Sequence, residues 1–163
     1  MEIKIRPATV SDVPLILRFI RGLAEYERLV QHVTATEAGL RESLFGKWPA
    51  AEVVIAEAAA EPVGFALFFH NYSTFLGQRG LYLEDLFVKP EWRHRGVGRQ
   101  LLAHLAKTAL DRNCGRMEWA VLDWNDPAIR FYRGLGAQPM EDWTVFRVTG
   151  EALAALAGVR TGV

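Results

Sequence analysis

The sequence has little of several features that would assign it quickly to a class of proteins. It contains one cysteine, Cys114, so no disulfide can form within the chain, and a structural role for this residue beside Gly115 is expected. No apolar run approaches the roughly 18–20 residues that a membrane-spanning helix needs. The first residues do not form a signal-peptide pattern either. We therefore expect a cytoplasmic protein without a membrane partner.

An excess of charge is also missing. The chain has 19 basic and 19 acidic residues among 163, which argues against a nucleic-acid partner because such proteins usually carry a basic excess. His70, His94 and His104 lack the spacing of metal ligands, so no metal is expected. Half of the residues are hydrophobic, and this length is typical of one folded domain, predicted over residues 1–163.

Hydrophobic periodicity predicts strands mixed with helices. Strands are expected over 2–6, 52–60, 63–70, 81–88, 116–122 and 144–148, and helices from Ser11 onward and over 37–46, 99–112, 126–135 and 151–157. Residues 71–79 are expected to form a loop. This order predicts an α/β fold in which helices cover a mixed sheet.

Residues 80–98 are the most informative stretch of the chain. A strand with two adjacent acids leads into a short basic turn, and Gly96 and Gly98 then open a helix. Backbone N–H groups at a helix start, assisted by the helix dipole, bind anions, and glycine allows a ligand to approach the main chain closely. Arg93, Arg95 and Arg99 add cations that suit phosphate. The stretch predicts a site for a diphosphate-bearing ligand, and the alternative is a basic loop before a surface helix.

The same residues carry a resemblance to a known family. Arg93-x-x-Gly96-x-Gly98 after a strand, with Asn125 and Tyr132 further on, resembles the GCN5-related N-acetyltransferases (GNAT superfamily). The segments around 26–27, 84–85 and 124–127 are similar to those of the diamine (spermidine/spermine) N1-acetyltransferases, and the likeness spans roughly residues 3–150. It implies a mostly antiparallel mixed sheet that splays into a V, with helices on both faces, acetyl-CoA as the donor, and a homodimer.

The resemblance also implies which residues hold acetyl-CoA. The diphosphate would lie on the glycine loop, the pantetheine arm would pair with the strand backbone, and Arg133 would reach the phosphates. The expected cofactor-binding residues are Leu86, Phe87, Val88, Arg93, His94, Arg95, Gly96, Val97, Gly98, Arg99, Asn125, Pro127 and Arg133. Core packing is the alternative for residues 86–88, and helix capping is the alternative or additional role for Asn125.

The chemistry of acetyl transfer suggests roles for further residues. A primary amine with a pKa of about 10.4 must lose a proton before it attacks a thioester. By resemblance Glu84 binds the ammonium and passes on its proton, while Asp85 should face the opposite side of the strand. Tyr132 would protonate the leaving thiolate as general acid, unless it is only a packing aromatic. Tyr26, Glu27, Glu84 and Asp85 are the expected substrate-binding residues.

The sequence thus predicts an N-acetyltransferase that acts by direct attack on a small polyamine-like or diamine-like substrate. Residues 138–142 are shorter than the matching family segment, so the identity of the acceptor stays open. The alternatives are a lysine-like or thialysine-like amino acid, a protein amine, or a non-catalytic acyl-CoA-binding sensor.

Overall fold

The computed structural model describes residues 2–159. Its sheet has five strands in the order β1-β2-β3-β4-β5, in which β4 and β5 are parallel and all other neighbours antiparallel. The strands are β1 (Ile3–Pro7), β2 (Glu52–Ala58), β3 (Glu61–Ser73), β4 (Gln78–Val88) and β5 (Met117–Trp119). The α-helices are α1 (Val13–Tyr26), α2 (Glu37–Phe45), α3 (Val97–Asp111), α4 (Asp126–Gly134) and α5 (Gly150–Leu156). Short 3₁₀ turns are η1 (Val10–Asp12), η2 (Val30–His32) and η3 (Pro90–Trp92). This architecture confirms the predicted fold class.

The chain divides into two compact units between residues 122 and 123. The first contains the sheet with α1, α2 and α3, and the second contains α4 and α5. The single domain over residues 1–163 stays a prediction, and its ends at 1 and 160–163 lie outside the described residues.

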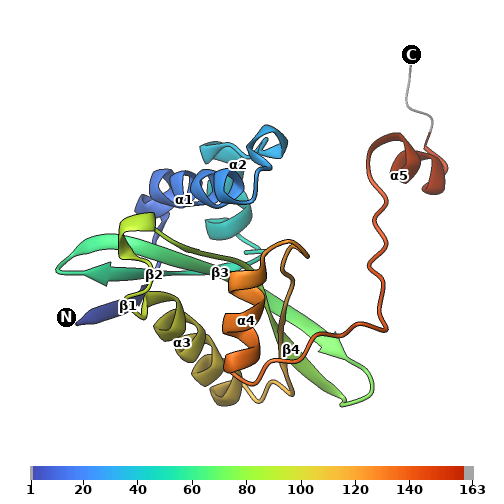
Figure 1. Ribbon diagram of the computed structural model, residues 1–163. Coiled ribbons are helices and arrows are strands. Elements are labelled where there is room, and N and C mark those ends of the chain that lie inside the picture. The colour runs from blue at the N-terminus through green and yellow to red at the C-terminus, as the bar shows by residue number, and fades with distance from the viewer. Residues whose placement is uncertain (1, 160–163) are drawn as a thin grey trace. The chain divides into compact units, whose positions relative to one another are not determined.

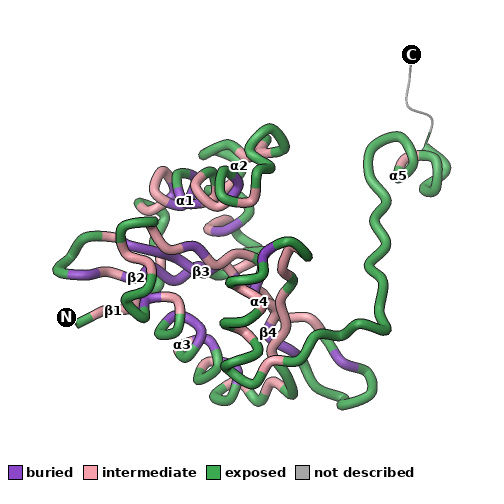
Figure 2. The backbone as a smooth tube through the Cα atoms, in the orientation of Figure 1, coloured by how far each residue is buried: buried purple, intermediate pink, exposed green. Residues whose placement is uncertain are grey.

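Helices cover both faces of the sheet in the first unit (Figure 1). On one face, Ile16 and Phe19 of α1 and Leu44 of α2 pack on Val53, Ile55, Phe65 and Phe87. On the other, α3 packs against β1, β3 and β4, and its Leu101 and Leu105 are fully buried. Figure 2 shows the resulting buried layer along β2, β3 and the inner side of α3.

A glycine brings α1 close to β4. Phe19 of α1 lies 5.4 Å from Phe65 and 5.7 Å from Phe87, measured between ring centroids. One turn further along, a Cβ atom on Gly22 would lie 2.7 Å from Cζ of Phe87, so any side chain there would have to displace the buried Phe87 ring. The absence of a side chain at Gly22 therefore sets the separation of helix and strand, and it brings the end of α1, Tyr26, towards β4.

A β-bulge in β4 separates the environments of its two adjacent acids. Leu67 of β3 pairs with Asp85 and the next residue, Phe68, pairs with Leu83, so Glu84 is an extra residue without a partner in β3. Because Leu67 packs against the core below α1, Asp85 opposite it points to that same face, whereas Leu83 points to the α3 face with Phe68. Asp85 shares the α1 face with Phe87, two residues further on, by ordinary alternation, and the bulge turns Leu83 to the opposite face.

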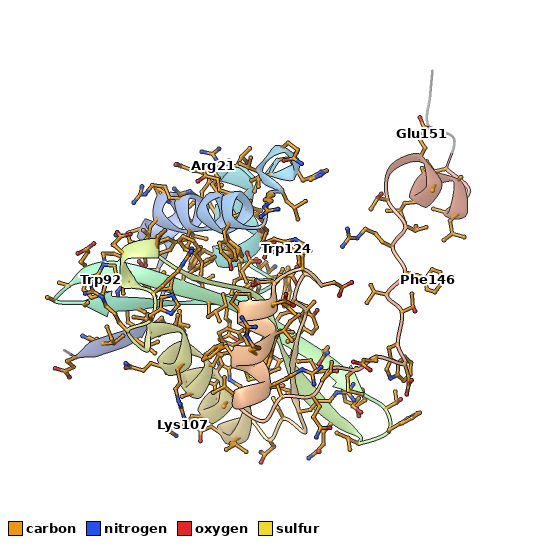
Figure 3. All side chains as sticks on the ribbon, viewed as in Figure 1. Arg21, Trp92, Lys107, Trp124, Phe146 and Glu151 are labelled. Carbon is orange, nitrogen blue, oxygen red and sulfur yellow. The ribbon has the colours of Figure 1, made fainter. Side chains whose placement is uncertain are left out.

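Three expected elements differ from the structure. The strand expected over 116–122 is reduced to β5, Met117–Trp119. Residues 71–79 are not one loop, because β3 runs to Ser73 and β4 begins at Gln78, and a tight turn at Gly77 with φ +63° joins them. Residues 144–148 form no strand, although the composition is strand-like; Val145 and Phe146 are 88% and 92% exposed. A strand needs a neighbour for its backbone groups, and within residues 2–159 none pairs with this segment. The side chain of Phe146 accordingly projects from an extended chain (Figure 3).

Candidate active site

The turn between β4 and α3 has the geometry of an anion-binding helix start. Gly96 is the N-cap of α3 with φ +81°, a left-handed conformation that favours glycine, and His94 before it also has a positive φ of 59°. Gly96 has no side chain to cap the helix, and its carbonyl accepts the first helical hydrogen bond from the N–H of Gln100 at 3.0 Å. First-turn N–H groups of a helix have no carbonyl partner within it and suit an anionic ligand.

Open space beside this turn fits close approach of a ligand. A Cβ atom on Gly96 would have no neighbour within 4 Å, and one on Gly98 would meet only Cγ2 of Val88 at 3.9 Å. Gly98 is helical with no positive φ, so neither conformation nor crowding within the protein requires glycine there. Glycine in a helix costs roughly 0.5–1 kcal/mol relative to alanine. The space at Gly98 therefore fits the expected diphosphate.

Next to the turn between β4 and α3, one edge of β4 is open. Pairing with β5 ends at Leu83 opposite Trp119, but β4 continues to Val88, and no strand among residues 2–159 pairs with that edge of its last part. The N–H of Lys89 donates to the carbonyl of Val63 in β3. Backbone groups of successive residues in a strand point to alternate sides, so those of Leu86 and Val88 point away from β3, to the open edge. Because β5 ends at Trp119, this part of the β4 edge is unpaired, as the expected V requires. The backbone of Leu86 and the N–H of Val88 are available to a pantetheine arm, while the carbonyl of Val88 already accepts from Nε of Arg93.

Phe87 has a different role from its two neighbours. Its carbonyl oxygen faces β3, where it would lie 2.6 Å from a Cβ atom on Gly64. Its ring is buried against Phe19 of α1. Any backbone pairing with a cofactor therefore rests on Leu86 and Val88, and Phe87 provides the core contact that fixes the strand.

Arg93, in the turn between β4 and α3, contacts both β4 and the end of α1. Its Nε donates to the carbonyl of Val88 at 3.0 Å, and its guanidinium carbon lies 4.7 Å from the centre of the Tyr26 ring and 5.8 Å from that of Phe87. Arg93 is thus engaged with the protein. Arg95, which lies over the ring of Trp92 at 5.1 Å, and Arg99 are exposed cations beside the glycines. Trp92 is labelled in Figure 3.

Three carboxylates gather where the end of α1 meets β4. Asp85 is half-buried on the α1 face, and burial, together with the charges of Glu84 and Glu27, raises its pKa to about 6. Glu27, the C-cap of α1, is half-buried too, and burial raises its pKa. Glu84 is exposed at the bulge, and Tyr26 is 39% exposed. Crowded carboxylates of this kind are stabilised by a bound cation such as an ammonium group.

The remaining expected site residues lie in the second unit. Asn125 is 8% exposed and caps α4, with its Oδ1 accepting from the N–H of Ala128 at 3.4 Å, and Pro127 follows in the first turn. Tyr132 and Phe131 have ring centroids 5.6 Å apart, and Arg133 forms an ion pair with Glu141 at 4.0 Å. The capping role for Asn125 is therefore seen in the structure.

A cavity that was not expected from the sequence lies between α1, the start of β3 and the end of β4. Its volume is about 310 Å³, and Leu15, Arg18, Phe19, Pro62, Phe87 and Lys89 line it. Lys89 pairs there with Glu61 at 3.0 Å. One face of α1 contains residues 15, 18, 19, 22 and 26. Their helical spacing could have predicted from the sequence that this face, with Gly22, packs on the sheet.

Within residues 2–159, no group of three or more histidine, cysteine, aspartate or glutamate side chains is arranged to hold a metal ion. No helix in this part of the chain combines the length and the apolar character of a membrane span.

Comparison with known proteins identifies the family. The model of the acetyltransferase (GNAT) family matches residues 21–137. The chain belongs to this family. The predicted membership is confirmed, and with it the expectation of an N-acetyltransferase.

Named relatives cover nearly the whole chain. The thialysine N-epsilon-acetyltransferase of Bos taurus is 42% identical over 167 residues, which cover 96% of this chain and 98% of that protein. The L-ornithine N5-acetyltransferase of Arabidopsis thaliana is 35% identical, with 94% and 87% covered. A spermidine/spermine N(1)-acetyltransferase-like protein 1 of Homo sapiens is 33% identical over 94% of this chain and 24% of that longer protein.

A solved structure agrees with the fold. An integron cassette protein from the mobile metagenome of V. cholerae superposes with a TM-score of 0.80 at 28% sequence identity, and the match covers 96% of this chain and 98% of that one.

Proposed function

We propose that this GNAT-family enzyme transfers the acetyl group of acetyl-CoA to the terminal side-chain amine of a small amino acid related to lysine, such as thialysine or ornithine. The observation that carries the proposal is the 42% identity to a thialysine N-epsilon-acetyltransferase over nearly the full length of both chains. The ornithine enzyme among the relatives supports the same substrate class, because it too is named for a side-chain amine of an amino acid.

A diamine or polyamine acceptor is the second candidate. The similarity to a spermidine/spermine acetyltransferase-like protein favours it, and so do three neighbouring carboxylates, which suit a substrate with several ammonium groups. A basic amino acid carries two ammonium groups and one carboxylate, whereas spermidine carries three ammonium groups and no carboxylate, so the amino acid gains less from each additional acid in the site.

The donor would bind along β4 and the glycine turn. In this proposal the diphosphate accepts from the N–H groups of residues 96–99, with Arg95 and Arg99 as neighbouring cations, and Leu86 and Val88 pair with the pantetheine arm. The resemblance supports Asn125, Pro127 and Arg133 as further donor-binding residues. The bound donor supplies an acetyl thioester, which an amine attacks directly.

The protein's own groups would handle the protons. The acceptor binds as an ammonium ion near Tyr26 and the three carboxylates, where loss of its proton has an implied cost of roughly 4–5 kcal/mol at pH 7 for an amine pKa near 10.4. The resemblance supports Tyr132 as the general acid that protonates the CoA sulfur, since a phenol with a pKa near 10 stays protonated at neutral pH. It also supports a homodimer, which sedimentation equilibrium tests.

A panel of amines tests the proposed function. Purified protein is mixed with acetyl-CoA and thialysine, lysine, ornithine, putrescine, spermidine or a lysine-containing peptide, and free thiol is measured against a reaction without amine. We expect kcat/KM for thialysine to exceed that for spermidine by at least about tenfold, which corresponds to roughly 1.4 kcal/mol of transition-state discrimination. Preference for spermidine would establish the second candidate. Binding of CoA without thiol release from any amine would favour an acyl-CoA sensor.

A further inference from the structure

We propose that Asp85, rather than Glu84, takes the proton from the acceptor amine, with Glu27 as the carboxylate beside it. The inference rests on the proposed function, because it assigns a step of acetyl transfer to an amine. It changes the role expected from the resemblance, in which Glu84 passes on the proton.

The geometry of β4 separates the two acids. The bulge leaves Glu84 unpaired and exposed, while Asp85 pairs with Leu67 and lies on the α1 face, where the ring of Phe87 also lies. The end of α1 approaches this face because Gly22 allows close contact with Phe87. Asp85 is therefore the half-buried acid of the pair and the one nearer to Glu27 and Tyr26.

The surroundings of Asp85 prepare it to accept a proton near neutral pH. Glu27 from α1 and Glu84 from its own strand both disfavour its ionised form, and burial disfavours it more strongly, so its pKa is raised to about 6. Tyr82 lies on the same face of β4, and Leu67 opposite is apolar. Arg93 is a cation close to this group of residues, over the rings of Tyr26 and Phe87. A proton acceptor works best when its pKa lies near the operating pH.

An N–H bond of the ammonium breaks and an O–H bond forms on the Asp85 carboxylate, which leaves the nitrogen lone pair on the neutral amine. The lone pair forms the N–C bond as the C–S bond of the thioester breaks. The nitrogen also loses a second proton, which offsets the proton that the CoA sulfur gains. Asp85 then returns its own proton to water.

The test is the pH dependence of kcat/KM for the acceptor, measured from pH 5 to 9 in three proteins. The wild type should lose activity below an ionisation near pH 6. Asp85→Asn, which keeps the shape of the side chain, should lose that acidic limb and lower kcat by roughly 10²–10⁴-fold. Glu84→Gln should keep the limb, move it to lower pH because a neighbouring negative charge is gone, and lower kcat by less than about tenfold.

Two further readouts separate proton transfer from a structural role. The Asp85→Asn defect should shrink for an acceptor whose amine has a lower pKa, because that amine is already neutral without help from a base. Calorimetry with CoA should give wild-type affinity and circular dichroism a wild-type spectrum. A higher acceptor KM with unchanged kcat would make Asp85 a binding residue and overturn the proposal.

Other outcomes also decide the proposal. Loss of the acidic limb in Glu84→Gln, with its retention in Asp85→Asn, would return the role to Glu84. Failure of the wild type to acetylate any amine would refute the proposed function and this inference together, whereas an active wild type with an unchanged Asp85→Asn profile would refute the inference alone.

Discussion

Replacing Gly98 by alanine should separate the stability of the fold from the binding of the donor. Gly98 lies in the first turn of α3 without a positive φ, and an added methyl group would meet only Val88 Cγ2, at an ordinary contact distance of 3.9 Å. Alanine restricts the unfolded chain and favours the helix, so Gly98→Ala should stabilise the protein by roughly 0.5–1 kcal/mol. The same methyl group would occupy the space where a diphosphate approaches the backbone. Overpacking of this kind costs about 1–3 kcal/mol, which predicts a 5- to 150-fold loss of CoA affinity.

Urea unfolding and calorimetric titration with CoA would measure the two effects in the same preparation. Gly134→Ala provides a matched control, because Gly134 ends α4 and also has open space around its Cα; it should leave CoA affinity unchanged. Gly96→Ala provides the contrast, since φ +81° strains alanine and should lower the stability. If Gly98→Ala binds CoA with wild-type affinity, the diphosphate does not lie against this turn.

Three other predictions follow from particular residues. The pKa of Asp85 is about 6 in the folded protein and about 3.9 in an unfolded chain, so its ionised form disfavours folding above pH 6. Asp85→Asn should therefore raise the free energy of unfolding at pH 8 by up to about 3 kcal/mol, and by much less near pH 4. Urea melts at the two pH values would measure this difference. Tyr132→Phe should lower kcat by roughly 10²–10⁴-fold with little change in the KM for acetyl-CoA, and near-normal steady-state turnover would leave Tyr132 a packing residue. Gly22→Ala should destabilise the protein by about 1–3 kcal/mol, because its methyl group would lie 2.7 Å from the Phe87 ring; an unchanged melting temperature would contradict this contact.

The fold and the donor turn were largely predictable because their signals are local. Residues 93–98 combine glycines and arginines just before a helical period, and that pattern specifies a turn whatever the rest of the chain does. The strands of the sheet likewise follow from short apolar runs. The hairpin between β3 and β4 extended further than expected, since polar residues such as Asn71 and Arg79 continue a ladder once their neighbours are paired.

The site around Asp85 was less predictable because it depends on pairing between strands. Period-two alternation correctly separates neighbouring side chains, but it cannot reveal that Glu84 is the extra residue of a bulge, which only the register with Leu67 and Phe68 defines. The pKa of Asp85 depends on burial under α1, and that depends on Gly22 at a distance in the sequence. Residues 144–148 have the composition of a strand but form none. A strand also needs a neighbouring strand, and composition does not reveal whether one is present.

The most direct test of the account is a competition in one vessel. Purified protein is given limiting acetyl-CoA and equal concentrations of thialysine and spermidine, and the products are identified by mass spectrometry and NMR. The account predicts mainly thialysine acetylated on its side-chain nitrogen, with one CoA thiol released for each acetyl group transferred. Acetylspermidine as the main product, acetylation of the α-amine, or thiol release without an acetylated amine would contradict it.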